Sequence, residues 1–213
     1  MRDKKMRKIV IIINGNGGVG KDTLCDFANE CYKVKSISSI TPIKEMARLG
    51  GWMGEKDPKS RKFLADLKKV FVEYNDRPYQ YLIEQYKIFL GDDSQILFAH
   101  IREGNEIDKF RQYVDIPCAT LLIRRKLPLK NWGNDSDDNV ENYEYDYVYD
   151  NDKTLVEAKK DFQIFLNKVV FDIIERDVPR TDENSYNLFS QNRLAGTVCD
   201  WYMQSQELLQ KRV

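Results

Sequence analysis

Uninterrupted apolar runs alternate along the chain with segments in which apolar residues recur every three or four positions. The runs at 8–13, 96–99 and 119–123 show no polar alternation, which is typical of strands buried on both faces of a parallel sheet. Two shorter runs, at 34–39 and 145–149, predict two further strands. Helical periodicity marks the segments 24–31, 43–49, 63–74, 82–90, 106–113 and 155–174.

Strands that alternate with helices predict an α/β fold, with a mainly parallel five-stranded sheet between two helical layers in an α/β/α arrangement. We expect one domain over residues 1–176 and a helical extension over 177–213, which either docks on that domain or makes a homodimer contact. The helical stripes are expected in the core. The most regular of them comprises Phe63, Leu64, Leu67, Val70, Phe71 and Tyr74.

The segment between the first strand and the first helix carries the clearest candidate chemistry. Gly15 and Gly20-Lys21 have the spacing of the phosphate-binding loop G-x-x-x-x-G-K-[ST]. Glycines let successive backbone N–H groups point at phosphate oxygens, and the lysine reaches the outer phosphates. We therefore expect nucleotide binding by Gly15, Asn16, Gly17, Gly18, Val19, Gly20, Lys21, Asp22 and Thr23. The alternative is a glycine-rich turn without a ligand.

Asp22 departs from the motif, because it stands where a hydroxyl usually binds Mg²⁺. Two functions fit a carboxylate at this position: it binds Mg²⁺ directly or through water, or it caps the first helix. Thr23 is then available to a more inward phosphate.

Composition narrows the class of protein. The 213 residues include 34 basic and 34 acidic side chains, so no general attraction to nucleic acid or to anionic membranes is expected. Four scattered cysteines and one histidine favour neither a zinc site nor a Cys–His nucleophile. No apolar stretch is long enough for a membrane span, and the start lacks a signal-peptide core, so we expect a cytoplasmic protein.

Cations follow the predicted strands where open α/β sheets bind ligands. Arg124 and Arg125 come directly after the fourth strand and begin a predicted lid at about 124–144 that could close over a triphosphate. Arg102 follows the third strand and is a candidate for holding an acceptor phosphate, with Lys44 and Arg61 as further candidates. An exposed run of charges is the alternative for Arg124 and Arg125. Surface ion pairs are the alternative for Arg102, Lys44 and Arg61.

The chain resembles the P-loop nucleoside monophosphate kinases, and among them the deoxynucleoside monophosphate kinase family, whose loop also reads G-K-D-T. Thr41-Pro42-Ile43-Lys44-Glu45 is similar to its G-P-I-K-D segment, and Arg61-Lys62-Phe63-Leu64 to its R-x-L-L helix start. The segment 101–106 resembles its D-x-R-x-x-x-E region, and 147–155 its V-I-T-N-D-G-S-L ending.

This resemblance implies a three-layer kinase fold, ATP with Mg²⁺, and transfer of the γ-phosphoryl group to a (deoxy)nucleoside 5′-monophosphate. It also implies that Lys21 stabilises the migrating group, that Arg102 holds the acceptor phosphate and that Asn151 faces the adenine, although a turn residue is the alternative for Asn151. Two positions depart from the family. His100 stands in place of its acid, and the lid is basic only at its start.

Two other classes of nucleotide-binding protein compete with a kinase. A switch GTPase requires an N-K-x-D motif to read guanine, and the sequence has none. A scaffold that binds nucleotide without turnover is favoured by Asp22 and His100, because the loss of a Mg²⁺ ligand weakens charge stabilisation in the transition state.

Overall fold

A computed structural model describes residues 7–126 and 140–176. Five strands form one sheet in the order β2-β3-β1-β4-β5, and every neighbouring pair is parallel. The strands are β1 (Ile9–Asn14), β2 (Val34–Ser38), β3 (Ile96–His100), β4 (Cys118–Arg124) and β5 (Tyr147–Asp150). The predicted parallel α/β fold is thus confirmed in the described part of the chain.

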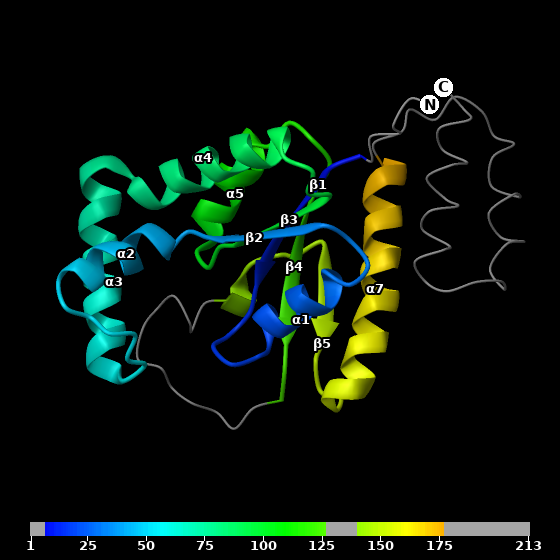
Figure 1. Ribbon diagram of the computed structural model, residues 1–213, viewed down its shortest axis with the longest axis horizontal. Helices are drawn as coiled ribbons and strands as arrows, with labels where there is room; N and C mark the ends of the chain where they lie inside the picture. Colours follow the sequence, from blue (N-terminus) through cyan, green and yellow to red (C-terminus); the bar gives the residue numbers. More distant parts are fainter. Residues whose placement is uncertain (1–6, 127–139, 177–213) are drawn as a thin grey trace, which may run out of the picture.

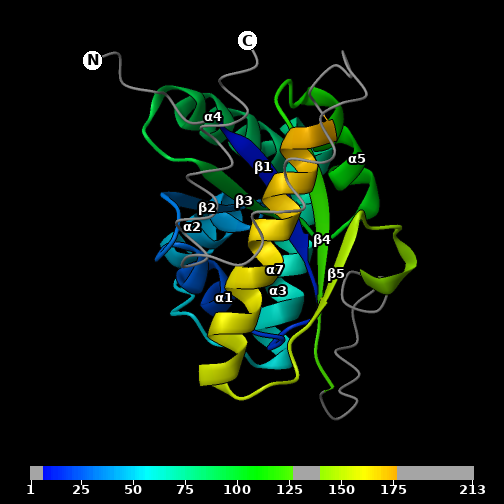
Figure 2. The same ribbon diagram turned by 90° about the vertical axis from the view of Figure 1, so that its right-hand side faces the viewer.

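Helices cover both faces of the sheet (Figures 1 and 2). One face carries α1 (Lys21–Ala28) and α7 (Leu155–Arg176), and the other carries α4 (Arg77–Gly91) and α5 (Gly104–Tyr113). The short α2 (Thr41–Leu49), the long α3 (Pro58–Asn75) and the 3₁₀ turn η1 (Val140–Asn142) complete the described elements.

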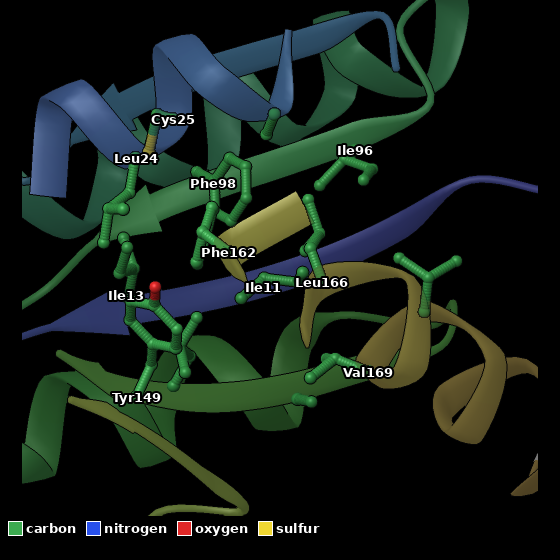
Figure 3. Packing of buried hydrophobic residues seen from close by; sticks show 14 of the residues in the cluster. Ile11, Ile13, Leu24, Cys25, Ile96, Phe98, Tyr149, Phe162, Leu166 and Val169 are labelled. Atoms are coloured by element: carbon green, nitrogen blue, oxygen red, sulfur yellow. The ribbon is translucent and has the colours of Figure 1, made fainter. Parts of the chain in front are cut away.

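The core consists of two apolar layers because alternate side chains of each strand point to opposite faces. Ile9, Ile11 and Ile13 of β1 pack with α1 and α7, whereas Val10 and Ile12 pack with α4 and α5. Figure 3 shows the first layer, in which side chains of β1, β3, α1, α7 and β5 meet. Strand β1 is buried along its whole length, which explains its unbroken run of branched apolar residues.

The sheet order puts a switch point at β1. β1 lies between β3 and β4, with β2 beyond β3 and β5 beyond β4. The connections after the strands therefore run to opposite sides of β1, and the loop that leaves the carboxyl end of β1 lies between them. Ligands of open α/β sheets bind at such points. The loop 15–20 therefore lies at the position that the topology favours for binding.

The prediction that the stripe of α3 belongs to the core was wrong. No residue of α3 is buried, and Val70 and Tyr74 are 59% and 81% exposed. The reason is that α3 packs on α2 and α4 rather than on the sheet (Figure 1). Helical periodicity shows which residues share one face of a helix. It does not show whether that face packs on the sheet or only on the edges of other helices.

Other predictions fall within a few residues of the observed elements. The strand predicted at 145–149 spans 147–150, and the helix predicted at 106–113 begins at Gly104. Residues 127–139 of the predicted lid and the predicted extension 177–213 lie outside the described residues. Within the ranges 7–126 and 140–176, no helix is long and apolar enough to cross a membrane.

The α7 layer provides a test of the core. Phe162 is fully buried and contacts the Tyr149 ring edge to face, at 5.1 Å between centroids, whereas Ile164 on the same helix is half exposed. We expect Phe162→Ala to lower the free energy of unfolding by about 3–5 kcal/mol because it leaves a cavity. Ile164→Ala, the matched control, should change it by about 0.5 kcal/mol or less in urea titrations. Equal effects would contradict the packing of α7.

Candidate active site

The loop after β1 has a backbone that only glycine adopts without strain. Gly15, Gly18 and Gly20 have φ angles of 142°, 87° and 92°. A Cβ on Gly15 would collide with the carbonyl oxygen of Ile123 in β4, and one on Gly20 would lie 2.7 Å from the amide nitrogen of Asn151. The loop therefore runs in direct contact with the ends of two other segments, and its glycines are required by sterics.

Lys21 turns back into this loop. Its ammonium donates hydrogen bonds to the backbone carbonyls of Gly15 and Asn16, the latter at 3.0 Å. The amide oxygen of Asn16 is buried and has no hydrogen-bond partner among the described residues. The Lys21 ammonium inside a glycine cradle fits an anionic ligand such as a polyphosphate, whereas the Asn16 oxygen is an acceptor and would need a donor.

Two asparagine side chains hold the loop through hydrogen bonds to its backbone. The Asn14 side chain accepts a hydrogen bond from the Gly15 amide and donates to the Arg102 carbonyl at 2.9 Å and to the Tyr145 hydroxyl at 2.7 Å. The Asn151 amide donates to the Val19 carbonyl at 2.8 Å. Sequence analysis missed Asn14, although a polar residue at the end of a buried strand and directly before the loop was a usable signal.

Asp22 lies in the first turn of α1, with its side chain exposed. The N-cap of this helix is Gly20, and no side chain makes a cap hydrogen bond there. A capping role for Asp22 therefore has no support in the geometry. Within the described ranges no cluster of three His, Cys, Asp or Glu side chains forms a metal site. A lone carboxylate fits Mg²⁺, which is commonly held by one or two carboxylates together with substrate phosphates and water.

Two of the three candidate acceptor cations lie near one another. Burial lowers the pKa of Lys44, the positive charge of Arg102 lowers it further, and the negative charge of Asp22 opposes both. Arg48 and Lys56 add to the local positive charge. An anion bound here would relieve this repulsion, so the cluster suits a phosphate group.

Arg61, the third candidate, is held at the start of α3. Its guanidinium Nε donates to the Lys56 carbonyl at 3.1 Å. Arg61 therefore ties the first turns of α3 to the α2–α3 connection, where Lys56 contributes to the charge around Lys44. Sequence analysis did not single out Arg48 or Lys56, because nothing in their spacing relates them to Lys44.

His100 ends β3 beneath the first turn of α1. Its Nε2 lies 2.9 Å from the Ser36 hydroxyl and 3.8 Å from the Cys25 sulfur. Burial lowers its pKa to about 4; Asp22 opposes this shift, whereas Lys21 and Lys44 add to it. The imidazole is therefore neutral at neutral pH and engaged with neighbouring side chains at the partly buried end of β3.

A pocket of about 80 Å³ opens beside the far end of the loop. Its lining comes from α1, from the end of β4 and from the β5–α7 connection, and includes Thr23, Phe27, Arg125, Asn151, Lys153 and Leu155. Sequence analysis missed Lys153 and Phe27. The candidates Arg124 and Arg125 separate here, because Arg125 lines the pocket whereas Arg124 pairs with Glu141 at 3.2 Å.

Comparisons with known proteins bear on the fold. No family model matches the chain, and no curated protein matches it. The solved structure of dephospho-CoA kinase from Campylobacter jejuni matches with a TM-score of 0.50 and 15% identity, over 79% of this chain and 98% of that one.

Two other solved structures score lower. A tunicamycin resistance protein from Deinococcus radiodurans has a TM-score of 0.49 at 12% identity, over 75% of this chain and 96% of that one. A gluconokinase from Sinorhizobium meliloti 1021 has a TM-score of 0.47 at 12% identity, over 82% of this chain and 99% of that one. The described part of the chain has the α/β fold of the P-loop kinases.

Proposed function

We propose that the chain is an ATP-dependent phosphotransferase that moves the γ-phosphoryl group to a (deoxy)nucleoside monophosphate or a similar small phosphate. The observation that carries the proposal is the glycine cradle with the Lys21 ammonium inside it, at the switch point of a parallel sheet. The fold shared with a dephospho-CoA kinase is consistent with this class of reaction.

Phosphoryl transfer requires positioning and charge neutralisation more than covalent chemistry. ATP with Mg²⁺ would supply the phosphoryl group and neutralise part of its charge. We assign the triphosphate to the loop 15–23, the ion to Asp22 and the base to the pocket beside Arg125 and Asn151. Lys21 would neutralise negative charge on the transferring group. Arg125 lines the pocket and would contact a nucleotide bound in it.

The acceptor is assigned to the cluster around Lys44 and Arg102, on the other side of the loop from the pocket. Arg102 is anchored to the loop, since its carbonyl accepts from Asn14, the residue that also holds Gly15. Both subsites therefore depend on the same strand end, which would keep donor and acceptor in a fixed relation. The resemblance to deoxynucleoside monophosphate kinases favours a nucleotide as the acceptor.

A nucleotide-binding scaffold without turnover is the second candidate. It is favoured by the neutral His100, whose ring nitrogen is engaged with Ser36 and Cys25 where the similar kinase family has an acid.

An acceptor panel separates these candidates. We expect Mg-ATP and one of the eight common ribo- and deoxyribonucleoside monophosphates to give acceptor-dependent ADP, measured by a coupled assay. Binding of ATP without any acceptor-dependent ADP would contradict the kinase and favour the scaffold. ADP released at the same rate without an acceptor would indicate an ATPase instead.

Lys21→Ala should lower kcat/KM by about 100-fold or more, the usual cost of losing a group that stabilises transition-state charge. The matched control is Lys33→Ala, an exposed lysine paired with Asp93 at the start of β2. This control should retain activity, and both variants should unfold at the same urea concentration as the unchanged protein. Near-full activity of Lys21→Ala would remove the loop from the donor site.

Asp22→Ala should raise the Mg²⁺ concentration needed for half-maximal activity by about tenfold, because the phosphates and water would then hold the ion without a carboxylate. Asp26→Ala, which removes an exposed carboxylate one turn later on the same helix, is the control. An unchanged Mg²⁺ dependence of Asp22→Ala would leave this residue only a favourable interaction with the helix dipole.

A further inference from the structure

Helix α3 lies at the edge of the molecule, apart from the sheet (Figure 1). It has no buried residue, and its main packing partners are α2 and α4. The half-buried side chains Leu64, Leu67 and Phe71 give it only a thin apolar contact. Hydrophobic burial is thus a weak constraint on the orientation of α3, and polar contacts gain importance in setting it.

A compact ionic cluster connects the middle of α3 to the beginning of α5. The Lys68 ammonium lies 2.6 Å from a carboxylate oxygen of Glu103 and 2.9 Å from one of Glu106. The Lys68 side chain is only 14% exposed, whereas that of Lys69, the next residue on the helix, is 77% exposed. Lys68 therefore points away from solvent into a site formed by another helix, which is unusual for a lysine.

The same cluster is joined to the acceptor side of the site through the chain. Glu103 is the N-cap residue of α5 and directly follows Arg102. The Arg102 carbonyl accepts from Asn14, which also holds the first glycine of the loop. Residues 102–106 thus connect the loop and the acceptor cation at one end to α3 at the other.

The charges of the cluster do not balance unless one carboxyl group keeps its proton. Burial raises the pKa of Glu106 to about 7; Lys68 opposes this, and the charge of Glu103 and a hydrogen bond to it add to the shift. Burial also acts to raise the pKa of Glu103, but Lys68 and the bond from Glu106 outweigh it and lower this pKa. The two groups thus share one proton near neutral pH.

The other charged groups nearby are engaged elsewhere. On α5, Lys109 pairs with Asp76 between α3 and α4, and Asp108 accepts a hydrogen bond from the Tyr143 hydroxyl. On α3, Lys69 faces Glu73 at 4.0 Å. Arg102 precedes Glu103 and belongs to the cation cluster around Lys44. Lys68 is therefore the cation that the structure pairs directly with both glutamates.

We propose that Lys68, Glu103 and Glu106 form a positioning device that holds α3 against residues 102–106 and thereby sets the affinity of the site for its acceptor. The proposal rests on the proposed function, since it assigns these residues to the acceptor side of that site. They are positioning residues, because they act through Arg102 and α3 rather than on the reacting atoms.

The pH dependence follows from the sign of the shifts. A carboxyl group whose pKa is raised on folding stabilises the folded arrangement below its ordinary pKa, and this contribution is lost as the pH rises through the raised value, here about 7. Glu103, with a lowered pKa, contributes in the opposite sense and only in acid. The hold on α3 should therefore weaken as the pH rises from the ordinary carboxyl value of 4.5 through about 7, where Glu106 loses its proton beside the charged Glu103.

The first test needs no substrate. Hydrogen exchange of the free protein, followed by mass spectrometry, compares Lys68→Met with the control Lys69→Met at one pH. We expect exchange in the peptides of α3 to increase about tenfold in Lys68→Met alone, since local opening then costs less, and exchange in β1 and α7 to stay unchanged. Equal exchange of α3 in the two variants would overturn the proposal.

The second test uses the nucleoside monophosphate that the panel assay identifies as the fastest acceptor. Lys68→Met should raise the KM for this acceptor by about fivefold or more and leave the KM for ATP unchanged, because the device acts only on the acceptor side. Lys69→Met should change neither. An altered exchange of α3 with an unchanged acceptor KM would also overturn the proposal, since the cluster would then be purely structural.

Glu106→Gln keeps a neutral side chain that can donate to Glu103, so it imitates the protonated form without titrating. In the unchanged protein we expect the acceptor KM to rise above pH 7 relative to that of Glu106→Gln; ionisation of the acceptor phosphate is common to both proteins and cancels. Parallel pH profiles would contradict the role of the shared proton. Failure of every acceptor with the unchanged protein would contradict the proposed kinase instead, and the exchange experiment distinguishes that case.

Discussion

The close approach of the loop 15–20 to the ends of β4 and β5 is the constraint on which the site depends. Gly15 lies against the Ile123 carbonyl and Gly20 against the Asn151 amide, so these two positions have room for backbone but not for a side chain. The Asn14 side chain accepts a hydrogen bond from the Gly15 amide, and the Asn151 side chain donates one to the Val19 carbonyl. The cradle is thus held by the adjacent Asn14 and by Ile123 and Asn151, which lie more than a hundred positions away in sequence, so its shape depends on the assembled parallel sheet.

The loop separates two groups of cations. One side of the loop has a pocket beside Arg125 and Lys153, and the other has the half-buried Lys44 with Arg102. Asp22, between them on the first turn of α1, acts on Lys44 and on His100. A single exposed carboxylate among several cations suits a site that neutralises a polyphosphate and still retains one ligand for a hard divalent ion.

Helix α3 has few apolar contacts, and its position depends on polar contacts with other elements. No residue of its apolar stripe is buried, and the ionic cluster at Lys68 links α3 to α5. Two carboxyl groups that share a proton beside one ammonium give a contact whose strength varies near neutral pH. A hydrophobic contact of the same size would be stronger but would not respond to pH.

The sequence by itself determined the α/β fold, the number of the described strands and their order along the chain, and the glycine-rich loop after β1, because each depends on local rules. Unbroken branched runs identify buried parallel strands, and glycine spacing identifies a backbone with positive φ. The sequence also placed Arg102 and Arg125 at strand ends. Only the tertiary structure decided which cations lie together, that Arg124 faces Glu141 while Arg125 lines the pocket, and that α3 stays outside the core. These features depend on which elements become neighbours, and that is set by crossovers and helix packing between distant segments, which periodicity along the chain does not encode.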